Sequence, residues 1–421
     1  MRLLILSDGH VWKSEGLCWS RDPWLKLVGH LEPYFSSVLV CVPLRPGSDS
    51  DLAIGLNKDW NSDRIEWIHT FPHETVINYY KFLPLIIIQN LPIIAKAVRN
   101  SDIVFMRLPA MNGFLTMLLA RVFGKPLFCY FSGDQKVQIL QGGKYKGLWA
   151  APAKAIAIFH DFLNRRLVRV SRASMFEAEA SLERFGPINK NCIFMFPSMI
   201  EKNEIRERCD AENRVSGNNL LYVGRLAAEK GVGFLLEAMA LLMKENVQCT
   251  LNICGDGPER RSLEKMAENL GLGASVNFLG HVRWGEKLAR IYRESDILVI
   301  PSLSEGVPKV ALEAMANGVA VIATEVGGLP RIITDGENGL LVPPGSSAEM
   351  SEAIKTLLVD QNLMHHFVQK GYEFIREHTD EKQAQKIAAI MLNNAAIQPT
   401  EDFHPDKSKA NQTSGPCGPI S

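Results

Sequence analysis

The sequence predicts an α/β protein with two doubly wound domains, each a parallel sheet covered on both faces by helices. Short continuous apolar runs alternate with longer segments that have helical spacing, which is typical of strands buried on both faces. The pattern stops at a polar, charge-rich stretch over residues 201–219 and then starts again. The length of 421 residues suits this organisation, because domains average about 150 residues.

The expected elements follow the chain in two sets. Strands are expected over residues 3–6, 37–42, 102–106, 126–131, 219–223, 249–254, 275–279, 296–300 and 319–323. The corresponding units are an N-terminal Rossmann-like domain (1–200), a linker (201–218), a second Rossmann-like domain (219–372), a helix that is a candidate to return to the first domain (373–395), and a disordered tail (396–421). Ligands of such sheets bind at the carboxyl ends of the strands, so we expect the active site in a cleft between two facing domains.

The charge balance differs between the two halves of the chain. The sequence has 46 Lys and Arg against 46 Asp and Glu, but residues 1–200 carry a net charge of +7 and residues 201–421 a net charge of −7. This balance does not suggest a general nucleic-acid-binding surface. The basic first half suits an anionic partner such as lipid head groups or a phosphorylated acceptor, and the alternative is attraction between the two halves.

The cysteine pattern and the absence of long apolar runs indicate a cytoplasmic protein. The eight cysteines include no C-x-x-C pair, so we expect reduced thiols. No charge-free stretch exceeds 14 residues, and the apolar run at the N-terminus is short for a signal peptide. We therefore expect neither a secretion signal nor a membrane-spanning helix.

Two stretches of the first half combine apolar and basic residues. Residues 82–95 are apolar and are flanked by Lys81, Lys96 and Arg99. Residues 136–172 carry a single acid, Asp161, and eight basic residues: Lys136, Lys144, Lys146, Lys154, Arg165, Arg166, Arg169 and Arg172. An anionic bilayer attracts such surfaces. The alternative is an ordinary buried helix with a solvated basic face.

The second half begins with a loop suited to a diphosphate. The strand Leu220–Val223 is followed by Gly224, Arg225 and, five residues later, Lys230. Two cations and the free amides of a helix start at one strand end favour a phosphate site.

The loop Gly255-Asp256-Gly257-Pro258 at first suggests a dinucleotide fingerprint. No third glycine has the required spacing, and Pro258 follows the second glycine, so nicotinamide and flavin chemistry lose their main support. The loop still suits the wall of a nucleotide pocket. Gly280 and His281 end the next strand near the same pocket, although the alternative interpretation of His281 is a loop histidine with satisfied hydrogen bonds and no catalytic role.

The segment 300–318 has the most specific pattern. Glu305 lies in a strand-end loop, and Glu313 lies about two turns into the following helix. Carboxylates accept hydrogen bonds from sugar or ribose hydroxyls, and backbone amides face phosphate oxygens. The turn between the two glutamates consists of Gly306, Val307, Pro308, Lys309 and Val310.

In order, spacing and residue type, these motifs resemble the donor domain of the family-four retaining glycosyltransferases over roughly residues 219–375. The matching segments are Val223-Gly224-Arg225-Leu226, Gly255-Asp256-Gly257-Pro258, Glu305 to Glu313, and Gly327-Gly328-Leu329-Pro330 to Asn338-Gly339-Leu340-Leu341-Val342-Pro343. The resemblance implies the GT-B fold, with the nucleotide sugar held mainly by the second domain and the acceptor by the first. It implies no obligatory metal and no cofactor.

The resemblance also implies roles for single residues. Arg225 and Lys230 would hold the diphosphate and stabilise the leaving nucleotide, and Glu305 would bind hydroxyls of the transferred sugar. The turn after Glu305 would face sugar and phosphate, and Glu313 would hold the ribose. The base would be bordered by Gly255, Gly280 and His281, next to the loop that begins at Gly224.

Three positions depart from the family pattern. Many relatives have a histidine after the strand 126–131, where this chain has Ser132, Gly133 and Asp134; Asp134 is the candidate to take over an orienting catalytic role. The first loop has Gly9, His10 and a single Gly16 where many relatives have paired glycines, which leaves Gly16 as the candidate substrate contact. Arg331 stands where an acidic residue is usual, so it is expected to alter the sugar pocket or to bind an anionic group.

The resulting prediction is a retaining, metal-independent hexosyltransferase. It would move a sugar from a UDP- or GDP-sugar to a glycan or lipid-linked acceptor in polysaccharide or glycolipid biosynthesis. It would work in the cytoplasm, with a peripheral site at the inner face of the membrane as an option through the first domain. The alternatives are a nucleotide-sugar epimerase of the same fold and a catalytically inactive glycosyltransferase-like partner.

Overall fold

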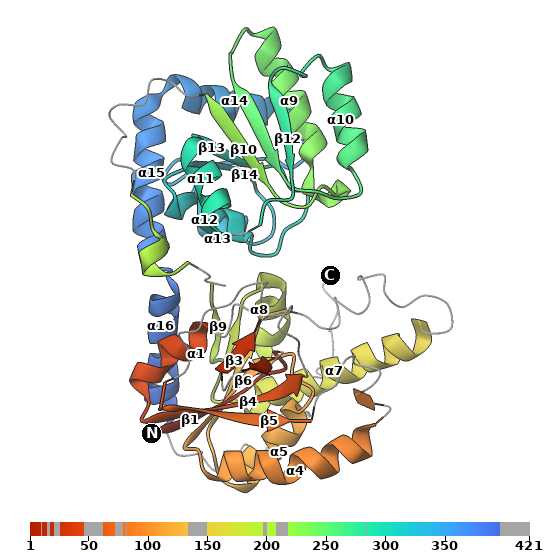
Figure 1. Cartoon of the computed structure of the whole chain (residues 1–421), viewed down its shortest axis with the longest axis vertical. Helices are drawn as coiled ribbons and strands as arrows, with labels where there is room; N and C mark the ends of the chain where they lie inside the picture. The colour runs from red at the N-terminus through yellow and green to blue at the C-terminus, as the bar shows by residue number, and fades with distance from the viewer. Residues whose placement is uncertain are drawn as a thin grey trace, which may run out of the picture.

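The structure is a computed structural model. It describes residues 1–9, 11–14, 17–20, 26–45, 62–71, 79–80, 82–133, 150–196, 200–207, 218–283 and 285–395. Within these residues the chain forms two α/β domains, each around its own sheet (Figure 1).

The first sheet has nine strands among the described residues, in the order β3-β2-β4-β1-β6-β7-β8-β9, with β5 also paired to β4. The strands are β1 (Arg2–Leu6), β2 (Val11–Ser14), β3 (Leu17–Ser20), β4 (Ser37–Arg45), β5 (Ile65–Thr70), β6 (Ile103–Leu108), β7 (Leu127–Phe131), β8 (Ala173–Phe176) and β9 (Cys192–Phe194). All pairs are parallel except β2 with β3, which form an antiparallel ribbon at the sheet edge. This ribbon lacks a continuous apolar run, so the strand pattern did not predict it.

Helices cover both faces of this sheet. The helical segments are α1 (Lys26–Leu31), η2 (Glu32–Tyr34), α4 (Leu83–Arg99), α5 (Gly113–Val122), α7 (Ala150–Val170), α8 (Glu179–Phe185) and η4 (Gly186–Ile188). Leu4 and Leu6 of β1 pack in one core with α4, α5, α7 and α8. Leu3 and Ile5 point to the other face because strand side chains alternate, and they pack with α1 and with α16 (Asp380–Ala395). The C-terminal helix therefore lies beside the first domain (Figure 1).

The second sheet has six parallel strands in the order β12-β11-β10-β13-β14-β15. They are β10 (Asn219–Val223), β11 (Thr250–Cys254), β12 (Val276–Gly280), β13 (Ile297–Ile300), β14 (Ala320–Thr324) and β15 (Leu340–Val342). The helical segments are η5 (Lys202–Glu204), η6 (Ala228–Lys230), α9 (Val232–Lys244), α10 (Arg260–Asn269), α11 (Glu286–Glu294), α12 (Lys309–Ala316), α13 (Leu329–Ile332), α14 (Ser347–Val359) and α15 (Gln361–Arg376). One core contains α9, α10 and α14, and the other contains α11, α12 and α13.

The expectation of two doubly wound domains is confirmed. All nine expected strands are present with ends within three residues of the predictions. Five described cysteines are free thiols, of which Cys41, Cys129 and Cys254 are buried. Among the described residues, no helix is both long and apolar enough to cross a bilayer.

Candidate functional site

The second sheet has a topological switch point beside β10. From β10 the chain continues to β11 and β12 on one side, and then returns to β13, β14 and β15 on the other side. Ligands of open parallel sheets bind outside the carboxyl ends of the strands at such a point. The loops that flank it are residues 224–231 after β10 and residues 301–308 after β13. Lys230 and Glu305 lie on these two loops.

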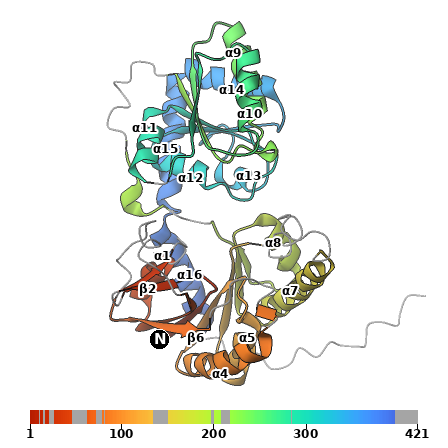
Figure 2. The ribbon, with the colours of Figure 1, turned by 45° about the vertical axis from the view of Figure 1, so that its right-hand side comes forward.

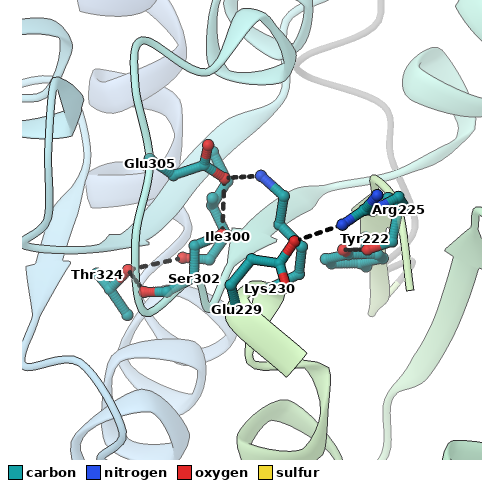
Figure 3. A network of polar contacts seen from close by, with 8 residues as sticks. All are labelled: Tyr222, Arg225, Glu229, Lys230, Ile300, Ser302, Glu305 and Thr324. Carbon is teal, nitrogen blue, oxygen red and sulfur yellow. Dashed lines mark hydrogen bonds and ion pairs between the residues drawn. The ribbon is translucent and has the colours of Figure 1, made fainter. Parts of the chain in front are cut away.

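Lys230 and Glu305 form an ion pair that joins the two loops (Figure 3). The Lys230 Nζ lies 2.6 Å from the Glu305 Oε1, and the two side chains are 24% and 11% exposed. The Ser302 hydroxyl donates to the same carboxylate oxygen at 2.7 Å, and the Thr324 hydroxyl donates to the Ser302 carbonyl at 2.6 Å. The carboxylate is thus held by groups of the loops after β10 and β13, and Thr324 at the end of β14 holds Ser302 in turn. An ammonium has three N–H donors, so Lys230 can bind Glu305 and an anion together.

Two glycines let these loops approach closely. Gly231 has a φ of +64°, and a Cβ there would lie 2.0 Å from the carbonyl oxygen of Pro301. Gly327 has a φ of +56°, and a Cβ there would lie 1.9 Å from the carbonyl oxygen of Glu305. Only glycine fits both the backbone angle and the space. The glycines therefore fix the approach that brings Lys230 to Glu305.

Arg225 lies on the same loop as Lys230 but has another partner. Its guanidinium lies 2.7 Å from the Glu229 carboxylate, four residues on, and its side chain is 65% exposed (Figure 3). A backbone hydrogen bond of Glu229 and the bond from Arg225 hold the pKa of Glu229 below its ordinary value. The Tyr222 hydroxyl donates to the Arg225 carbonyl at 3.0 Å and so orders the loop. A guanidinium has five N–H donors, so Arg225 can bind Glu229 and an anion together.

The structure brings the predicted glycines of three loops together. The Gly224 N–H donates to the Cys254 carbonyl at 3.0 Å, and the Gly255 N–H donates to the Gly280 carbonyl at 2.9 Å. A Cβ at Gly255 would lie 1.8 Å from the Gly224 carbonyl oxygen. His281 follows directly and is exposed. These backbone contacts form one wall beside the switch point.

The turn after Glu305 leads into α12. The Gly306 carbonyl accepts from the Gly328 N–H at 2.7 Å, which fixes the turn against the loop after β14. Pro308 is the N-cap of α12 and has no N–H, so it cannot donate to a ligand. Backbone donors of this turn come from Gly306, Val307, Lys309 and Val310. The first amides of a helix lack intrahelical acceptors, so the turn offers N–H groups next to Glu305.

Glu313 is held inside the domain, on α12. The Tyr292 hydroxyl of α11 donates to its Oε2 at 2.8 Å. Burial raises the pKa of Glu313, and the Tyr292 hydrogen bond and the charge of Lys309 oppose the rise. Any further hydrogen-bond donor, such as a ribose hydroxyl, therefore stabilises the ionised carboxylate.

The first sheet has its own switch point, between β1 and β6. Asp8 follows β1, and its Oδ2 accepts from the Met111 N–H, after β6, at 2.5 Å. Asp8 is not among the site residues predicted from the sequence, although a carboxylate close after the first apolar run is a visible signal. Burial lowers the pKa of His160 to about 4, and the nearby charge of Asp8 opposes this shift. The Tyr80 hydroxyl lies 2.8 Å from the His160 Nε2.

The two candidate residues of the first domain, Asp134 and Gly16, lie outside the described residues. Arg331 is described, and it joins the domains. Its guanidinium pairs with Glu179 of α8 and lies 4.4 Å from the centre of the Phe194 ring. The position where the resemblance leads one to expect an acid thus holds a contact between the second domain and the first.

One group of described residues has metal-ligand spacing. The ligand atoms of His30, Glu201 and Asp380 lie within 4.8 Å of one another. The Lys26 ammonium lies 2.9 Å from Glu201 and competes with a cation there. The trio lies beside α1 and α16, apart from the switch point of the second sheet.

The sequence comparisons match the second domain. Residues 204–374 match the family model described as Glycosyl transferases group 1. An alpha-D-kanosaminyltransferase from Streptomyces kanamyceticus is 38% identical over 160 residues, which are 38% of this chain and 40% of that protein. The aligned region therefore spans less than half of that relative.

The structural comparisons cover both domains. Sucrose-phosphate synthase from Thermosynechococcus elongatus matches with a TM-score of 0.65 and 20% identity, over 93% of this chain and 98% of that one. Anabaena HepE in complex with UDP matches with a TM-score of 0.64 and 18% identity, over 93% and 100%. The fold is GT-B, as the resemblance implies.

Proposed function

We propose that the chain is a retaining glycosyltransferase, on the premise that residues 204–374 match the group 1 glycosyl transferases and that the fold is GT-B. It takes a UDP- or GDP-sugar and transfers the hexose to a glycan or lipid-linked acceptor. Residues 219–372 hold the nucleotide sugar, and residues 1–200 hold the acceptor. HepE, which has the same fold, binds UDP, and this supports a uridine nucleotide as the first to test.

The observation that carries the proposal is the Lys230–Glu305 ion pair at the switch point. A cation, a carboxylate and a turn with free amides meet there. A nucleotide sugar needs this combination, because its diphosphate is anionic and its sugar offers hydroxyl donors. Glu313 lies on α12, the helix that follows this turn, and we assign to it the hydrogen bond from the ribose.

The chemistry follows from these positions. The bond between the anomeric carbon and the phosphate oxygen breaks, and its electron pair stays on the diphosphate. Lys230 and Arg225 stabilise that charge as it develops. The acceptor hydroxyl attacks from the same face, and its proton passes to the phosphate oxygen that leaves. This route retains the anomeric configuration and needs neither a separate protein base nor a resident metal.

The acceptor side is proposed to use Asp134 and Gly16, with Asp8 at the switch point of the first sheet as an additional candidate. The proposed setting is polysaccharide or glycolipid assembly at the inner face of the membrane. The basic character of the first half, with a net charge of +7 over residues 1–200, supports an anionic setting.

The experiment is incubation of the full chain with UDP- and GDP-sugars, with and without a panel of glycan and lipid-linked acceptors. Acceptor-dependent product with the anomeric configuration of the nucleotide sugar supports the proposal. Conversion of the nucleotide sugar to its epimer without acceptor identifies an epimerase instead. Tight nucleotide binding with no turnover on any acceptor favours an inactive partner, and an inverted product refutes the retaining mechanism.

A further inference from the structure

Three neighbouring helices of the first domain expose apolar side chains to solvent. Helices α4, α5 and α7 lie side by side on one face of the first sheet, opposite α1 and α16 (Figure 2). Their inner faces are buried in the core. A surface helix normally carries polar residues on its outer face, so the outer faces of these helices need a separate explanation. We call them together the α4–α5–α7 surface.

The exposed apolar residues follow each helix. On α4, Ile86, Asn90 and Ile94 point into the protein, while Ile88 is 70% exposed. On α5, the exposed residues recur every four positions, so they form one stripe. The large exposed apolar residues of the surface are Phe82, Leu85, Ile87, Ile88, Leu91, Phe114, Leu118, Val122, Phe123, Ile158, Phe159, Phe162 and Val170. A patch of this kind is larger than scattered single residues and marks an interaction site.

Basic residues accompany the patch. Residues 82–172 contain 13 Lys and Arg against 3 Asp and Glu. On α7, the Arg166 guanidinium lies 5.4 Å from the centre of the Phe162 ring, so cation and apolar side chain share one surface. Asp161 is already paired with Arg165 and Arg184. Lys81, Lys136, Lys144 and Lys146 lie outside the described residues.

Cations lie next to the exposed apolar residues of the surface. The exposed apolar residues of α4 occupy its first half, and Lys96 and Arg99 follow at its end. Exposed apolar side chains run along the whole of α5. The last turns of α7 carry cations together with exposed apolar side chains, namely Arg165, Arg166 and Arg169 with Phe162 and Val170.

We propose that the α4–α5–α7 surface docks the first domain on an anionic phospholipid bilayer. Large aliphatic and Phe side chains next to Lys and Arg are the composition of an interfacial membrane surface. A second copy of this chain would bring two surfaces of the same positive charge together, which opposes self-association. The inference deepens the proposed function and rests on it in one respect: it assigns the acceptor to a lipid-linked molecule presented by that bilayer.

The mode of docking follows from this mixture. The large apolar side chains enter the boundary of the acyl chains, and the cations beside them contact the phosphates of the head groups. The three helices belong to the domain proposed to hold the acceptor, so a lipid-linked acceptor in the same bilayer lies next to that domain.

The test is flotation of the full chain with vesicles of phosphatidylcholine containing phosphatidylglycerol and with vesicles of phosphatidylcholine alone. Val122→Glu and Val359→Glu form a matched pair, because both valines are 76% exposed and Val359 lies on α14 of the second domain. We expect salt-sensitive binding to the anionic vesicles only. Val122→Glu should reduce it by about ten-fold, and Val359→Glu should leave it unchanged.

A second variant tests the charges without adding one to an apolar site. Each basic residue near an anionic surface contributes about five-fold to binding, so Arg166→Gln with Arg169→Gln should weaken it by about 25-fold. Absence of binding to anionic vesicles, or equal losses for Val122→Glu and Val359→Glu, would overturn the proposal. So would a dimer in light scattering that Val122→Glu dissociates, because the surface would then be covered by a second copy.

Binding of UDP- and GDP-sugars by the same proteins separates this inference from the proposed function. If the vesicles bind and no UDP- or GDP-sugar does, the membrane surface stands and the glycosyltransferase assignment fails. If one of these sugars binds and vesicles do not, the membrane proposal alone is wrong.

Discussion

Replacing Lys230 with alanine removes the cation at the switch point of the second sheet. In the free protein its Nζ lies 2.6 Å from Glu305, and we propose that it also contacts the diphosphate of the nucleotide sugar. The variant keeps the Ser302 hydroxyl on the Glu305 carboxylate and the Thr324 hydroxyl on the Ser302 carbonyl, so the loop after β13 retains these contacts. Folding is therefore expected to survive the change.

The magnitude follows from the charge that develops on the leaving diphosphate. Two unit charges about 4 Å apart interact by about 4 kcal/mol at an effective dielectric constant of about 20. Removal of one preorganised electrostatic group typically costs about 2–4 kcal/mol of transition-state stabilisation. The expected loss in kcat/KM is thus about 30-fold to about 900-fold. Lys230→Arg keeps a cation and should retain more activity than Lys230→Ala.

The assay compares kcat/KM with thermal unfolding for both variants and for a matched control. Lys355 forms an ion pair of the same 2.6 Å length with Glu245, but both side chains are exposed and the pair joins α14 to the C-cap residue of α9. Lys355→Ala should leave activity unchanged. Activity of Lys230→Ala within a factor of a few of wild type, with the fold intact, would refute the role of Lys230.

Three further predictions address other parts of the site. Gly306→Ala should leave the melting temperature unchanged, since a Cβ there meets no atom within 4 Å. It should weaken UDP-sugar binding in calorimetry, because the methyl group fills space that the ligand needs. Gly273→Ala is the control: a Cβ there also meets no atom within 4 Å, and neither quantity should change. Because burial raises the pKa of Glu313, its carboxylate takes up a proton at a higher pH than an ordinary glutamate. The affinity for UDP-glucose should therefore rise with pH through that raised pKa in wild type and stay flat in Glu313→Gln; identical profiles would contradict the ribose contact. A double-mutant cycle of Arg331→Ala and Glu179→Ala, measured by thermal unfolding, should give a coupling free energy of about 1 kcal/mol or less, since this ion pair is partly exposed. A coupling free energy of several kcal/mol would contradict this and show that the contact between the domains is a main source of stability.

The sheets were predictable because their central strands are continuous apolar runs. β10 begins and ends at the predicted residues, and β1 differs by one residue at its start. The edge ribbon of β2 and β3 was not predictable in this way, since strands at an edge need not be apolar on both faces. β5 was missed for a related reason: it is an edge strand whose sequence, Ile-Glu-Trp-Ile-His-Thr, mixes polar and apolar residues.

The candidate site was predictable as a set of residues, and the structure adds their pairing. Lys230 and Glu305 are 75 positions apart in the chain, and only the strand order makes their loops neighbours. The partner of Arg331 could not be predicted, because Glu179 lies 152 positions away in the other domain. The apolar stretch 82–95 gave no sign of which residues face solvent, since both faces of α4 carry Leu and Ile.

The central claim is that the loops after β10 and β13 bind a nucleotide sugar, and a thermal-shift measurement with nucleoside diphosphates tests it most directly. Wild type is compared with Arg225→Ala and Glu313→Ala, using UDP, GDP and their sugars. A ligand at 100 times its dissociation constant stabilises a protein by about 2.7 kcal/mol, which raises the melting temperature measurably. We expect one base series to stabilise wild type and to have much less effect on both variants. No stabilisation by any of these ligands, or equal stabilisation of wild type and variants, would contradict the assignment of this site.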